Sequence, residues 1–460
     1  MSEHGLRASV GKMTRAGVGD AAVSSFVRQY RKLESGATGL IPETAIRPLL
    51  DVPRLDSTAA PTAAQARQAM SHLVIIKLNG GLGTSMGMQG PKSLLPVRDG
   101  RSFLDLIVAQ VFAARKHFDV ELPLLMMNSF STDEQTVKAL GGYPDLPVRG
   151  LPTSFVQSRE PRLRVDTLEP VSWPQDPTLE WCPPGHGDIY TTLTDSGLLE
   201  TLIEAGIWYA FVANCDNIGA VPDAGLASWF ASSGTPYAAE VCRRTPNDIK
   251  GGHLGIRVSD GRLILRDTAQ TPPADMPAFT DLVRHPFFHA NNLWWDLRAL
   301  QEQMRDGPLD LPLIRNVKTV DPADRASPPV VQIETAMGAA IEAFDGAMAI
   351  EVPRERFTPV KTTNELLLVR SDVFEVTPDA RLRSQVTSLP AVRLGERYQR
   401  VADFEQRIPE APSLREATSL AVDGDWWFGR GVRVSGDVRL ADDGCCHQVP
   451  DGAVLKGASP

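Results

Sequence analysis

A glycine-rich stretch directly after an apolar run constrains the fold of this 460-residue chain more than any other feature. The run Leu73–Ile76 predicts a buried strand, and the sequence NGGLGTSMGMQGPKS follows it at residues 79–93. Its glycines let the backbone approach a ligand closely, and consecutive N–H groups in such a loop form a concave anion site. Lys92 adds a positive charge near its end. The stretch therefore predicts a loop that wraps a nucleoside triphosphate.

Three alternatives to a triphosphate loop stay open on the residues alone. A dinucleotide-binding fingerprint needs its helix to begin within the glycine spacing, so that a pyrophosphate sits on the helix N-terminus. Here the loop is longer, and Pro91 lacks a backbone N–H. A P-loop needs Gly followed directly by Lys, whereas Pro91 separates Gly90 from Lys92. The third alternative is a surface turn without a ligand, which the preceding strand and the following lysine disfavour.

Composition narrows the class of protein and its compartment. The chain is acidic, with a formal net charge of -9 and a pI of about 5.5, and it has no basic cluster of the kind expected for nucleic-acid binding. No apolar run approaches the roughly 18 residues of a membrane helix, and the N-terminus lacks the apolar core of a signal peptide. The five cysteines form no C-x-x-C pair. We therefore expect a cytoplasmic protein with reduced thiols, in which a redox role for the adjacent Cys445 and Cys446 is the less favoured alternative.

The order of strands and helices predicts the fold class. Residues 71–370 alternate between the two, which predicts an α/β fold with a mostly parallel sheet and helices on both faces. Within it, residues 253–266 predict a hairpin inserted in the sheet, and residues 333–344 predict a buried helix. The remaining predicted helices cover residues 102–117, 131–140 and 196–205, and the remaining predicted strands cover residues 122–127 and 207–213.

The two ends of the chain differ from this central part. Residues 1–70 predict a helical and loop-rich lead-in, with a helix over residues 23–33. From residue 425 onward, short apolar steps separated by glycines predict a small β-domain. We place the domain boundaries at residues 1–70, 71–374 and 375–460.

Polar residues gather where two predicted strands end. In an open α/β sheet, ligands bind beyond the carboxyl ends of the strands. The glycine-rich loop begins there at Asn79, and Asn214, Cys215 and Asp216 follow the strand that ends at residue 213. Asp216 is a candidate ligand for Mg²⁺, which prefers carboxylate and phosphate oxygens. The alternative is that Asp216 and the next residue form a turn or cap a helix.

Four further segments carry candidate ligand groups. His186 lies between two glycines in a rigid loop and is a candidate for bonding a phosphate or a sugar hydroxyl. The Gln157 amide offers the donors and acceptors that suit a nucleobase edge. Asn291 and Asn292 place two amide side chains shortly before an aromatic residue, a pattern that suits binding of sugar hydroxyls. Lys361 stands at a predicted loop-to-helix boundary, which suits an anion. For each segment the alternative is that these polar residues bind no ligand and serve only in the structure or at the surface.

Long stretches of the chain resemble the eukaryotic-type UTP–glucose-1-phosphate uridylyltransferases, also called UDP-glucose pyrophosphorylases. The resemblance runs in order from about residue 71 to residue 374. Its motifs are LVIIKLNGGLGTSMGMQGPKS, FVQSREPRL, WCPPGHGDIYTTLTDSGLLETLIEAGIWYAFVANCDNIGA, FFHANNLW and VVQIETAMGAAIEAFDGAMAIEVPRERFTPVKTTNELLLVRSDVF. The resemblance implies a Rossmann-like nucleotidyltransferase core, a C-terminal left-handed β-helix and, through that domain, a homo-oligomer.

The resemblance also implies roles for individual residues. UTP would contact Leu78, Asn79, Gly80 and Gly81, with Lys92 on its phosphates and Gln157 and Gly185 on its uracil. Asp216 would ligate Mg²⁺, and Lys361 would bind phosphate at the reaction centre. The residues implied for glucose 1-phosphate are His186, Asn214, Asn291, Asn292 and Glu334.

The resemblance predicts transfer of the uridylyl group of UTP to glucose 1-phosphate by direct in-line displacement. The nucleophile is already anionic, so the chemistry requires positioning and charge stabilisation rather than a nucleophilic side chain. One alternative is a pyrophosphorylase for another sugar 1-phosphate, such as galactose 1-phosphate or N-acetylglucosamine 1-phosphate. A second alternative, from another class of protein, is a sensor that binds nucleotide sugars without catalysis.

Overall fold

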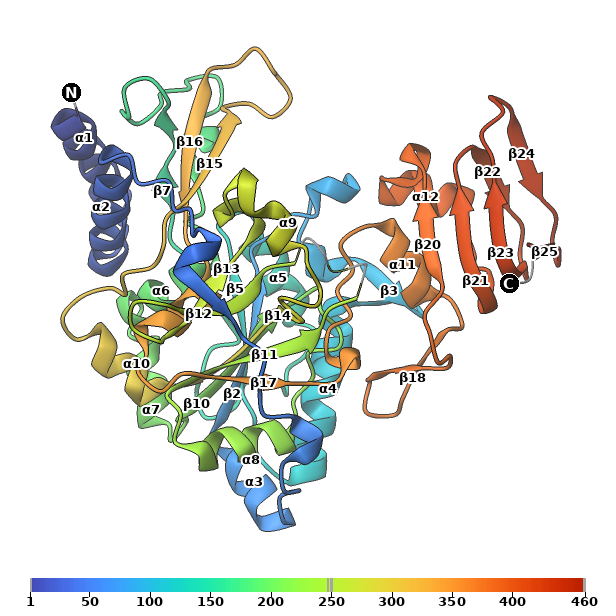
Figure 1. Cartoon of the computed structure of the whole chain (residues 1–460), viewed down its shortest axis with the longest axis horizontal. Helices are drawn as coiled ribbons and strands as arrows, with labels where there is room; N and C mark the ends of the chain where they lie inside the picture. Colours follow the sequence, from blue (N-terminus) through green and yellow to red (C-terminus); the bar gives the residue numbers. More distant parts are fainter. Residues whose placement is uncertain (1, 246–247, 249–250, 458–460) are drawn as a thin grey trace.

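A seven-stranded sheet forms the centre of the molecule in the computed structural model, which describes residues 2–245, 248 and 251–457. Neighbouring strands pair in parallel except β14, which is antiparallel to both of its neighbours. The predicted mostly parallel sheet is therefore confirmed (Figure 1). In spatial order the strands are β17 (Met348–Glu351), β11 (Tyr237–Arg243), β14 (Phe287–Asp296), β10 (Tyr209–Asn214), β2 (Leu73–Asn79), β5 (Leu124–Asn128) and β6 (Ser154–Val156).

The reversed direction of β14 matters for the site. Val212 of β10 pairs with Leu293 of β14, so the residues before Leu293 lie at the edge where β10 ends. The first half of β14 therefore meets the carboxyl ends of the parallel strands. For this reason Asn291 and Asn292 lie near the same edge as Asn214, although they stand in the middle of their strand.

Helices cover both faces of the sheet, as predicted. Alternate residues of β2 point to opposite faces, with Val74 in one apolar core and Ile75 in the other. The first core contains α6 (Ile189–Asp195), α7 (Leu198–Glu204) and α10 (Leu297–Met304), and the second contains α3 (Ala63–Ser71), α4 (Phe103–Phe118) and α8 (Ala224–Ser233).

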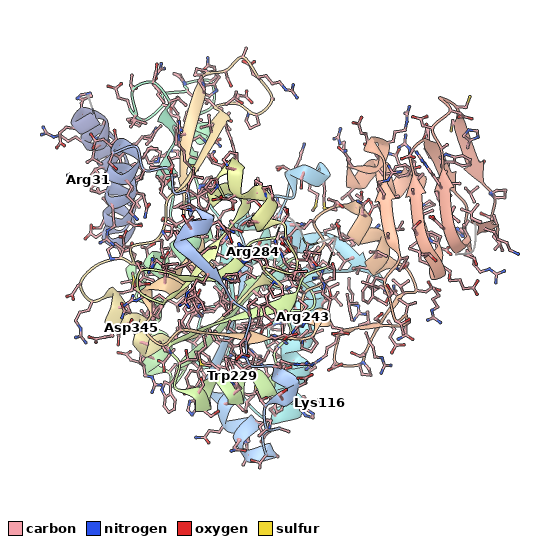
Figure 2. The ribbon with its side chains drawn as sticks, in the orientation of Figure 1. Arg31, Lys116, Trp229, Arg243, Arg284 and Asp345 are labelled. Atoms are coloured by element: carbon pink, nitrogen blue, oxygen red, sulfur yellow. The ribbon has the colours of Figure 1, made fainter. Side chains whose placement is uncertain are left out.

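Local signals predicted several of these helices correctly. Ser102 and Asp105 form a capping box, in which each side chain bonds the other residue's backbone N–H, and α4 begins directly after Ser102. The helix α5 (Asp133–Leu140) ends before Gly141, and the helix predicted over residues 23–33 lies within α2 (Asp20–Glu34). Exposed charges such as Arg31, Lys116 and Asp345 lie at the surface around this body (Figure 2).

Two predicted elements differ from the structure. The hairpin of β12 (His253–Arg257) and β13 (Leu263–Arg266) forms, but it pairs with β1 (Ile46–Pro48) in a separate three-stranded sheet and is not inserted in the central one. The helix predicted over residues 333–344 was wrong in its first part, because the strand β16 (Pro329–Glu334) continues into it. Only residues 337–343 are helical, as a 3-10 helix. Buried apolar runs do not distinguish a strand from a helix by themselves.

The N-terminal helices pack beside a second small sheet. This sheet contains β15 (Ile314–Thr319), β16 and β8 (Leu163–Arg164). Phe26 and Tyr30 of α2 share a core with Val331 and Ile333 of β16. Helix α1 (Ser2–Arg15) lies beside α2 at the upper left of Figure 1. The remaining short elements are β3 (Pro96–Arg98), β4 (Arg101–Ser102), β7 (Glu160–Pro161), β9 (Trp181–Cys182), α9 (Met276–Phe279), α11 (Thr363–Arg370), β18 (Phe374–Val376), β19 (Leu382–Ser384) and α12 (Val401–Arg407).

The C-terminal part consists of parallel strands that form two sheets. β20 (Ala391–Leu394), β21 (Ser413–Val422), β23 (Arg433–Leu440) and β25 (Val454–Lys456) form one sheet, and β22 (Asp425–Phe428) and β24 (Cys446–Val449) form the other. The apolar core of this part also contains Met86 and Val360, so it reaches the segments around Lys92 and Lys361. Among the described residues, no helix is long and apolar enough to cross a membrane.

Candidate active site

Three charged residues from distant parts of the chain meet at the carboxyl edge of the central sheet. Asp216 follows the end of β10, and its Oδ2 atom accepts hydrogen bonds from Lys92 Nζ at 2.8 Å and from Lys361 Nζ at 3.0 Å. The Asp216 and Lys92 side chains are 9% and 11% exposed, whereas that of Lys361 is 55% exposed. Two ammonium groups thus share one carboxylate, which leaves a local excess of positive charge for an anionic ligand.

The lysines fix the charge of Asp216. Burial by itself raises the pKa of this carboxyl group, but the positive charges of Lys361 and Lys92 and their hydrogen bonds outweigh burial and lower the pKa below its usual value. Asp216 is therefore ionised at neutral pH. The turn of the alternative is present, because Asn217 N–H donates to the Asn214 carbonyl at 3.2 Å, but the Asp216 side chain bonds the two ammonium groups rather than capping a helix.

The glycine-rich loop folds back on itself and brings Lys92 to the site. The backbone N–H of Lys92 donates to the Gly81 carbonyl at 3.1 Å, which closes the loop. A Cβ atom on Gly80 would lie 3.1 Å from Gln157 Nε2, so this amide rests against the start of the loop. The candidate phosphate loop and the candidate nucleobase reader are therefore neighbours. Leu78 and Asn79 precede them with buried side chains, and the Asn79 amide donates to Asn128 and Thr136 within the protein.

The loop around His186 is paired with the segment after β16. Thr335 N–H donates to the Pro184 carbonyl, and Gly187 N–H donates to the Thr335 carbonyl, both at 2.9 Å. Gly185 has φ of +81°, and a Cβ atom there would lie 2.5 Å from the Thr335 carbonyl oxygen. Only glycine fits this close approach without a shift of the backbone.

His186 is held as a neutral donor. Met337 N–H donates to its Nδ1 atom at 2.9 Å, so in the neutral ring the proton is on Nε2. Burial, with a smaller effect of the Lys361 charge, lowers the pKa of His186 to about 4. The electrostatic effect of Lys361 also means that His186 and the charged cluster lie near each other.

The two asparagines of β14 lie differently. Asn291 has φ of +55°, and its Nδ2 atom donates to Asn214 Oδ1 at 3.3 Å, which brings these two predicted residues together. Asn292 is fully buried, and its Nδ2 atom donates to Glu240 and to the Arg356 carbonyl. Its amide is thus engaged inside the protein. Glu334 is partly exposed and accepts from Asn316 at 2.9 Å, beside the Gly185 loop.

The sequence reasoning missed two residues that the structure places at this site. Asp188 accepts from the Ser158 backbone and hydroxyl, at 2.6 and 2.7 Å, and so ties the Gln157 segment to the His186 loop. His289 accepts the Asn291 N–H on Nδ1 at 3.3 Å, and burial, with a smaller effect of His186, lowers its pKa to about 3. The position of Asp188 inside the GHGD motif could have indicated its place at the site. His289 is a single histidine within a strand, and no sequence pattern marks it.

Comparison with known proteins identifies the family. Residues 23–435 match the family model described as UTP–glucose-1-phosphate uridylyltransferase. The chain belongs to this family. A probable uridylyltransferase of this name from Schizosaccharomyces pombe is 39% identical over 396 residues, which cover 85% of this chain and 77% of the relative. The Hordeum vulgare relative is 38% identical over 462 residues, covering 98% and 95% of the two chains.

Solved structures of this enzyme family share the whole fold. A variant of UDP-glucose pyrophosphorylase from Leishmania major in complex with UDP-glucose is 40% identical, covers 99% of both chains and gives a TM-score of 0.92. A structure from Trypanosoma brucei, named UDP-glucose phosphorylase, is 40% identical with a TM-score of 0.88, and the match covers 99% of this chain and 100% of that one.

The donor chemistry at Asp216 fits a Mg²⁺ ion that also binds phosphate oxygens. This ion is usually held by one or two carboxylates together with substrate phosphates, because it retains several waters. The described residues contain no cluster of three or more His, Cys, Asp or Glu side chains suited to a metal. A single ionised carboxylate between two ammonium groups fits an ion whose other ligands are phosphate oxygens and waters.

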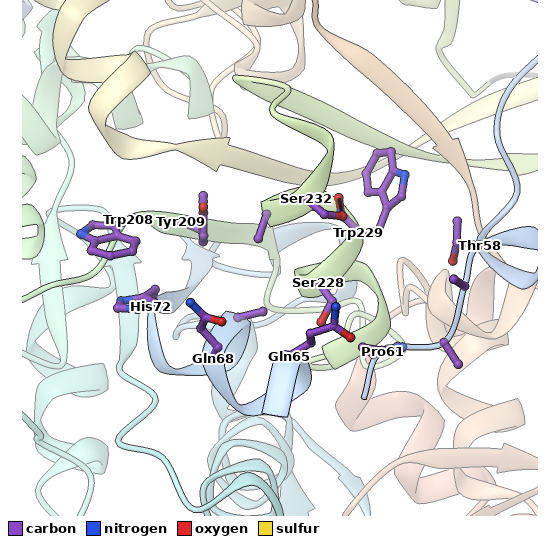
Figure 3. A pocket seen from close by; sticks show the side chains of 14 residues that line it. Thr58, Pro61, Gln65, Gln68, His72, Trp208, Tyr209, Ser228, Trp229 and Ser232 are labelled. Carbon is purple, nitrogen blue, oxygen red and sulfur yellow. Dashed lines mark hydrogen bonds between the residues drawn. The ribbon is translucent and has the colours of Figure 1, made fainter. Parts of the chain in front are cut away.

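A separate hollow lies away from this charged cluster. A cavity of about 430 Å³ is bounded by α3, α8 and the segment of residues 58–61 (Figure 3). His72, directly before β2, and Tyr209, the first residue of β10, lie on its wall, so it sits at the amino edge of the sheet. None of its 14 lining residues is Asp, Glu, Lys or Arg, and none is a predicted site residue.

Proposed function

We propose that this chain transfers the uridylyl group of UTP to glucose 1-phosphate and releases pyrophosphate. A phosphate oxygen of glucose 1-phosphate attacks the α-phosphorus of UTP. A new P–O bond forms, and the bond from the α-phosphorus to the bridging oxygen of pyrophosphate breaks. The bonding electrons leave with pyrophosphate, so no proton acceptor and no covalent enzyme intermediate is needed.

The convergence of Lys92, Lys361 and Asp216 carries this proposal. The two ammonium groups meet within hydrogen-bonding distance of one carboxylate, at the edge where α/β proteins bind ligands. In the reaction, both ammonium groups would turn to the phosphate oxygens and offset the charge that develops on the transferring phosphorus and on pyrophosphate. Fixed charges aimed at developing charge are often the largest single contribution to catalysis.

The other site residues would orient the two substrates. Gln157 and Gly185 would bind the uracil edge, and Leu78, Asn79, Gly80 and Gly81 would supply backbone groups around the nucleotide. On the sugar side, the N–H of His186 Nε2 would donate to a glucose hydroxyl or to the phosphate, and Asn214, Asn291 and Glu334 would bind further hydroxyls. We leave Asn292 out of this set because its side chain is buried with its amide engaged, and we add His289 beside His186.

Asp216 would hold Mg²⁺ together with the substrate phosphates, and the ion would supply further neutralisation of phosphate charge when bound. The thiol beside this residue is not a nucleophile in the proposal. Burial, with a smaller effect of Asp216, raises the pKa of Cys215 to about 12, so this thiol stays protonated at neutral pH.

We also propose three further features that the family resemblance suggests. The strands β20–β25, which alternate between two parallel sheets from β21 onward, form a short left-handed β-helix. The exposed Trp427 and Val454 of this part supply a surface for self-association. Sedimentation of the full chain tests the second feature, and a single monomeric species at micromolar concentration contradicts it.

The third feature is the compartment. All five cysteines are free, which suits the reducing cytoplasm.

Pyrophosphate release tests the proposed reaction. The purified chain is mixed with UTP and Mg²⁺, with and without glucose 1-phosphate, and UDP-glucose is measured in parallel. We expect pyrophosphate and UDP-glucose in equal amounts, only when both substrates and the metal are present. Equal or faster turnover of N-acetylglucosamine 1-phosphate or galactose 1-phosphate would favour the alternative sugar. Binding of UDP-glucose without any exchange of pyrophosphate would favour a sensor.

A further inference from the structure

A buried polar network lies beside the Lys361–Asp216 pair and takes no part in the reaction as described so far. Its centre is Glu240 in β11, whose side chain is fully buried. Four N–H groups donate to its two carboxylate oxygens: Arg356 Nη2 at 2.7 Å and Nε at 2.8 Å, Asn292 Nδ2 at 2.9 Å and Trp294 Nε1 at 3.0 Å. A buried charge with several good partners is held in one place, because losing a partner leaves the charge uncompensated.

Asn217 joins this network to the segment that carries Lys361. Its Nδ2 atom donates to Asn292 Oδ1 at 3.2 Å and to the Arg356 carbonyl at 3.1 Å. Its Oδ1 atom accepts the Thr358 N–H at 2.8 Å. One buried amide therefore bonds to the backbone on both sides of residue 357, and so fixes the direction in which the chain leaves the network.

Backbone contacts extend this link to the lysine. Asn217 and Pro359 form an antiparallel bridge, and Val360 N–H donates to the Asp216 carbonyl at 3.1 Å. A Cβ atom on Gly219 would lie 2.1 Å from the Glu355 carbonyl oxygen, so the two segments approach too closely for a side chain there. Residues 216–219 and 355–360 are thus packed as one unit, and Lys361 follows directly.

We propose that Asn217 is a positioning residue for uridylyl transfer, acting through Lys361. Its amide sets the path of residues 358–360 against the strand end that carries Asp216, and so sets where the Lys361 ammonium stands. The buried pair of Glu240 and Arg356 anchors the other side of the amide. Lys361 is a long side chain with a 55% exposed surface, and its reach depends on where its backbone is held. This inference rests on the proposed function.

The Asn217→Ala variant tests the proposal against Thr235→Val as a matched control. Thr235 is also buried, and its hydroxyl oxygen lies 2.9 and 2.8 Å from the Tyr237 and Gly346 carbonyl oxygens, to one of which it donates, at the opposite edge of the same sheet. Each variant loses at least one buried hydrogen bond to the backbone, so both are expected to lower the denaturation midpoint. We expect Asn217→Ala to lower kcat about tenfold or more with little change in KM for UTP, and Thr235→Val to leave kcat within about twofold.

A double-mutant cycle separates positioning from general loss of structure. If Asn217 acts through Lys361, adding Asn217→Ala to Lys361→Ala lowers kcat no further, because the group being positioned is already gone. Independent, multiplying effects of the two substitutions would overturn the proposal, as would wild-type kcat in Asn217→Ala. If Asn217→Ala does not fold, Asn217→Ser replaces it in the same cycle with the same two outcomes.

A second measurement does not depend on the reaction. Acylation of lysine amines by acetic anhydride, followed by mass spectrometry, reports how firmly Lys361 is held by Asp216. We expect faster labelling of Lys361 in Asn217→Ala than in the wild type and in Thr235→Val. Unchanged labelling overturns the proposal. A wild-type chain that makes no UDP-glucose defeats the proposed function alone, because this labelling result is read without substrates.

Discussion

The two edges of the central sheet offer a direct comparison. The amino edge has a hollow of about 430 Å³, yet the residues that line it carry no Asp, Glu, Lys or Arg. In its wall the Trp208 ring is already covered on two sides, by His72 at 3.7 Å between ring centroids and by the Arg298 guanidinium at 5.1 Å. The carboxyl edge holds the three charges, the glycine-rich loop and the neutral histidines. Charge and strand direction, rather than volume, therefore mark the site.

The largest effect is expected at Lys361. We predict that Lys361→Ala lowers kcat by on the order of 10²-fold or more while UTP binding changes little, because the lost charge acts mainly on the developing phosphate charge. Steady-state kinetics together with calorimetric titration of UTP measure the two quantities. Near-wild-type turnover in this variant would show that the charged cluster does not distinguish the active edge of the sheet from the other edge.

A second prediction uses two glycines that both have a positive φ, although Gly185 has ψ of 177° and Gly197 has ψ of 8°. Gly185→Ala places a Cβ atom 2.5 Å from the Thr335 carbonyl oxygen, so the loop of His186 has to move. Gly197 has φ of +68°, and a Cβ atom added there would meet nothing within 4 Å. We expect kcat/KM to fall about tenfold or more for Gly185→Ala and to change little for Gly197→Ala. Similar activities in the two variants would mean that the loop does not contribute to substrate positioning.

The third prediction concerns pH and the carboxyl edge. The pKa values of His186 and His289 are lowered to about 4 and about 3, chiefly by burial. Between those values and about 6.5 the unfolded chain binds protons that the folded chain does not, so the free energy of unfolding rises with pH there. The effect is at most about 1.4 kcal/mol per pH unit for each imidazole.

Urea unfolding at pH 5 and pH 7 measures this slope. Replacing both histidines in His186→Asn/His289→Asn should flatten it without abolishing it, because burial also lowers the pKa of His253 and His285. An unchanged slope would show that these two imidazoles are not held neutral at the site.

The smallest effect is expected at the amino edge. Gln68→Ala and Ser232→Ala change side chains on the wall of the 430 Å³ cavity. We predict kcat and both KM values within about twofold of the wild type, because the cavity contains no predicted site residue. A clear loss of activity in either variant would break the comparison and give the cavity a role in the reaction.

Local sequence signals predicted the parts of the fold that depend on neighbouring residues. The capping box at Ser102 and the buried run before Asn79 specify a helix start and a strand by themselves. The placement of the hairpin at residues 253–266 depends instead on pairing with β1, some 200 residues earlier, and no local pattern records that. The domain boundaries at residues 70 and 374 stay predictions.

The same distinction holds at the site. Lys92, Asp216 and Lys361 were predicted from their motifs, and the structure brings them together. The sequence offered no means to tell Asn291 from Asn292, because the reversed direction of β14 and the partner Glu240 decide which amide is buried. For the same reason the roles of Glu240, Arg356 and Asn217 were not predicted, since each depends on contacts across strands.

The distance in sequence between the members of the charged cluster has a consequence for how the protein is made. A ribosome delivers Lys92 and Asp216 well before Lys361 and before β17, the edge strand that pairs with β11. A nascent chain that has emerged only to residue 340 contains the glycine-rich loop and Lys92 but lacks Lys361. If Lys361 has the proposed role, such an intermediate has strongly reduced activity, and full activity is expected only once at least the first 361 of the 460 residues have been synthesised.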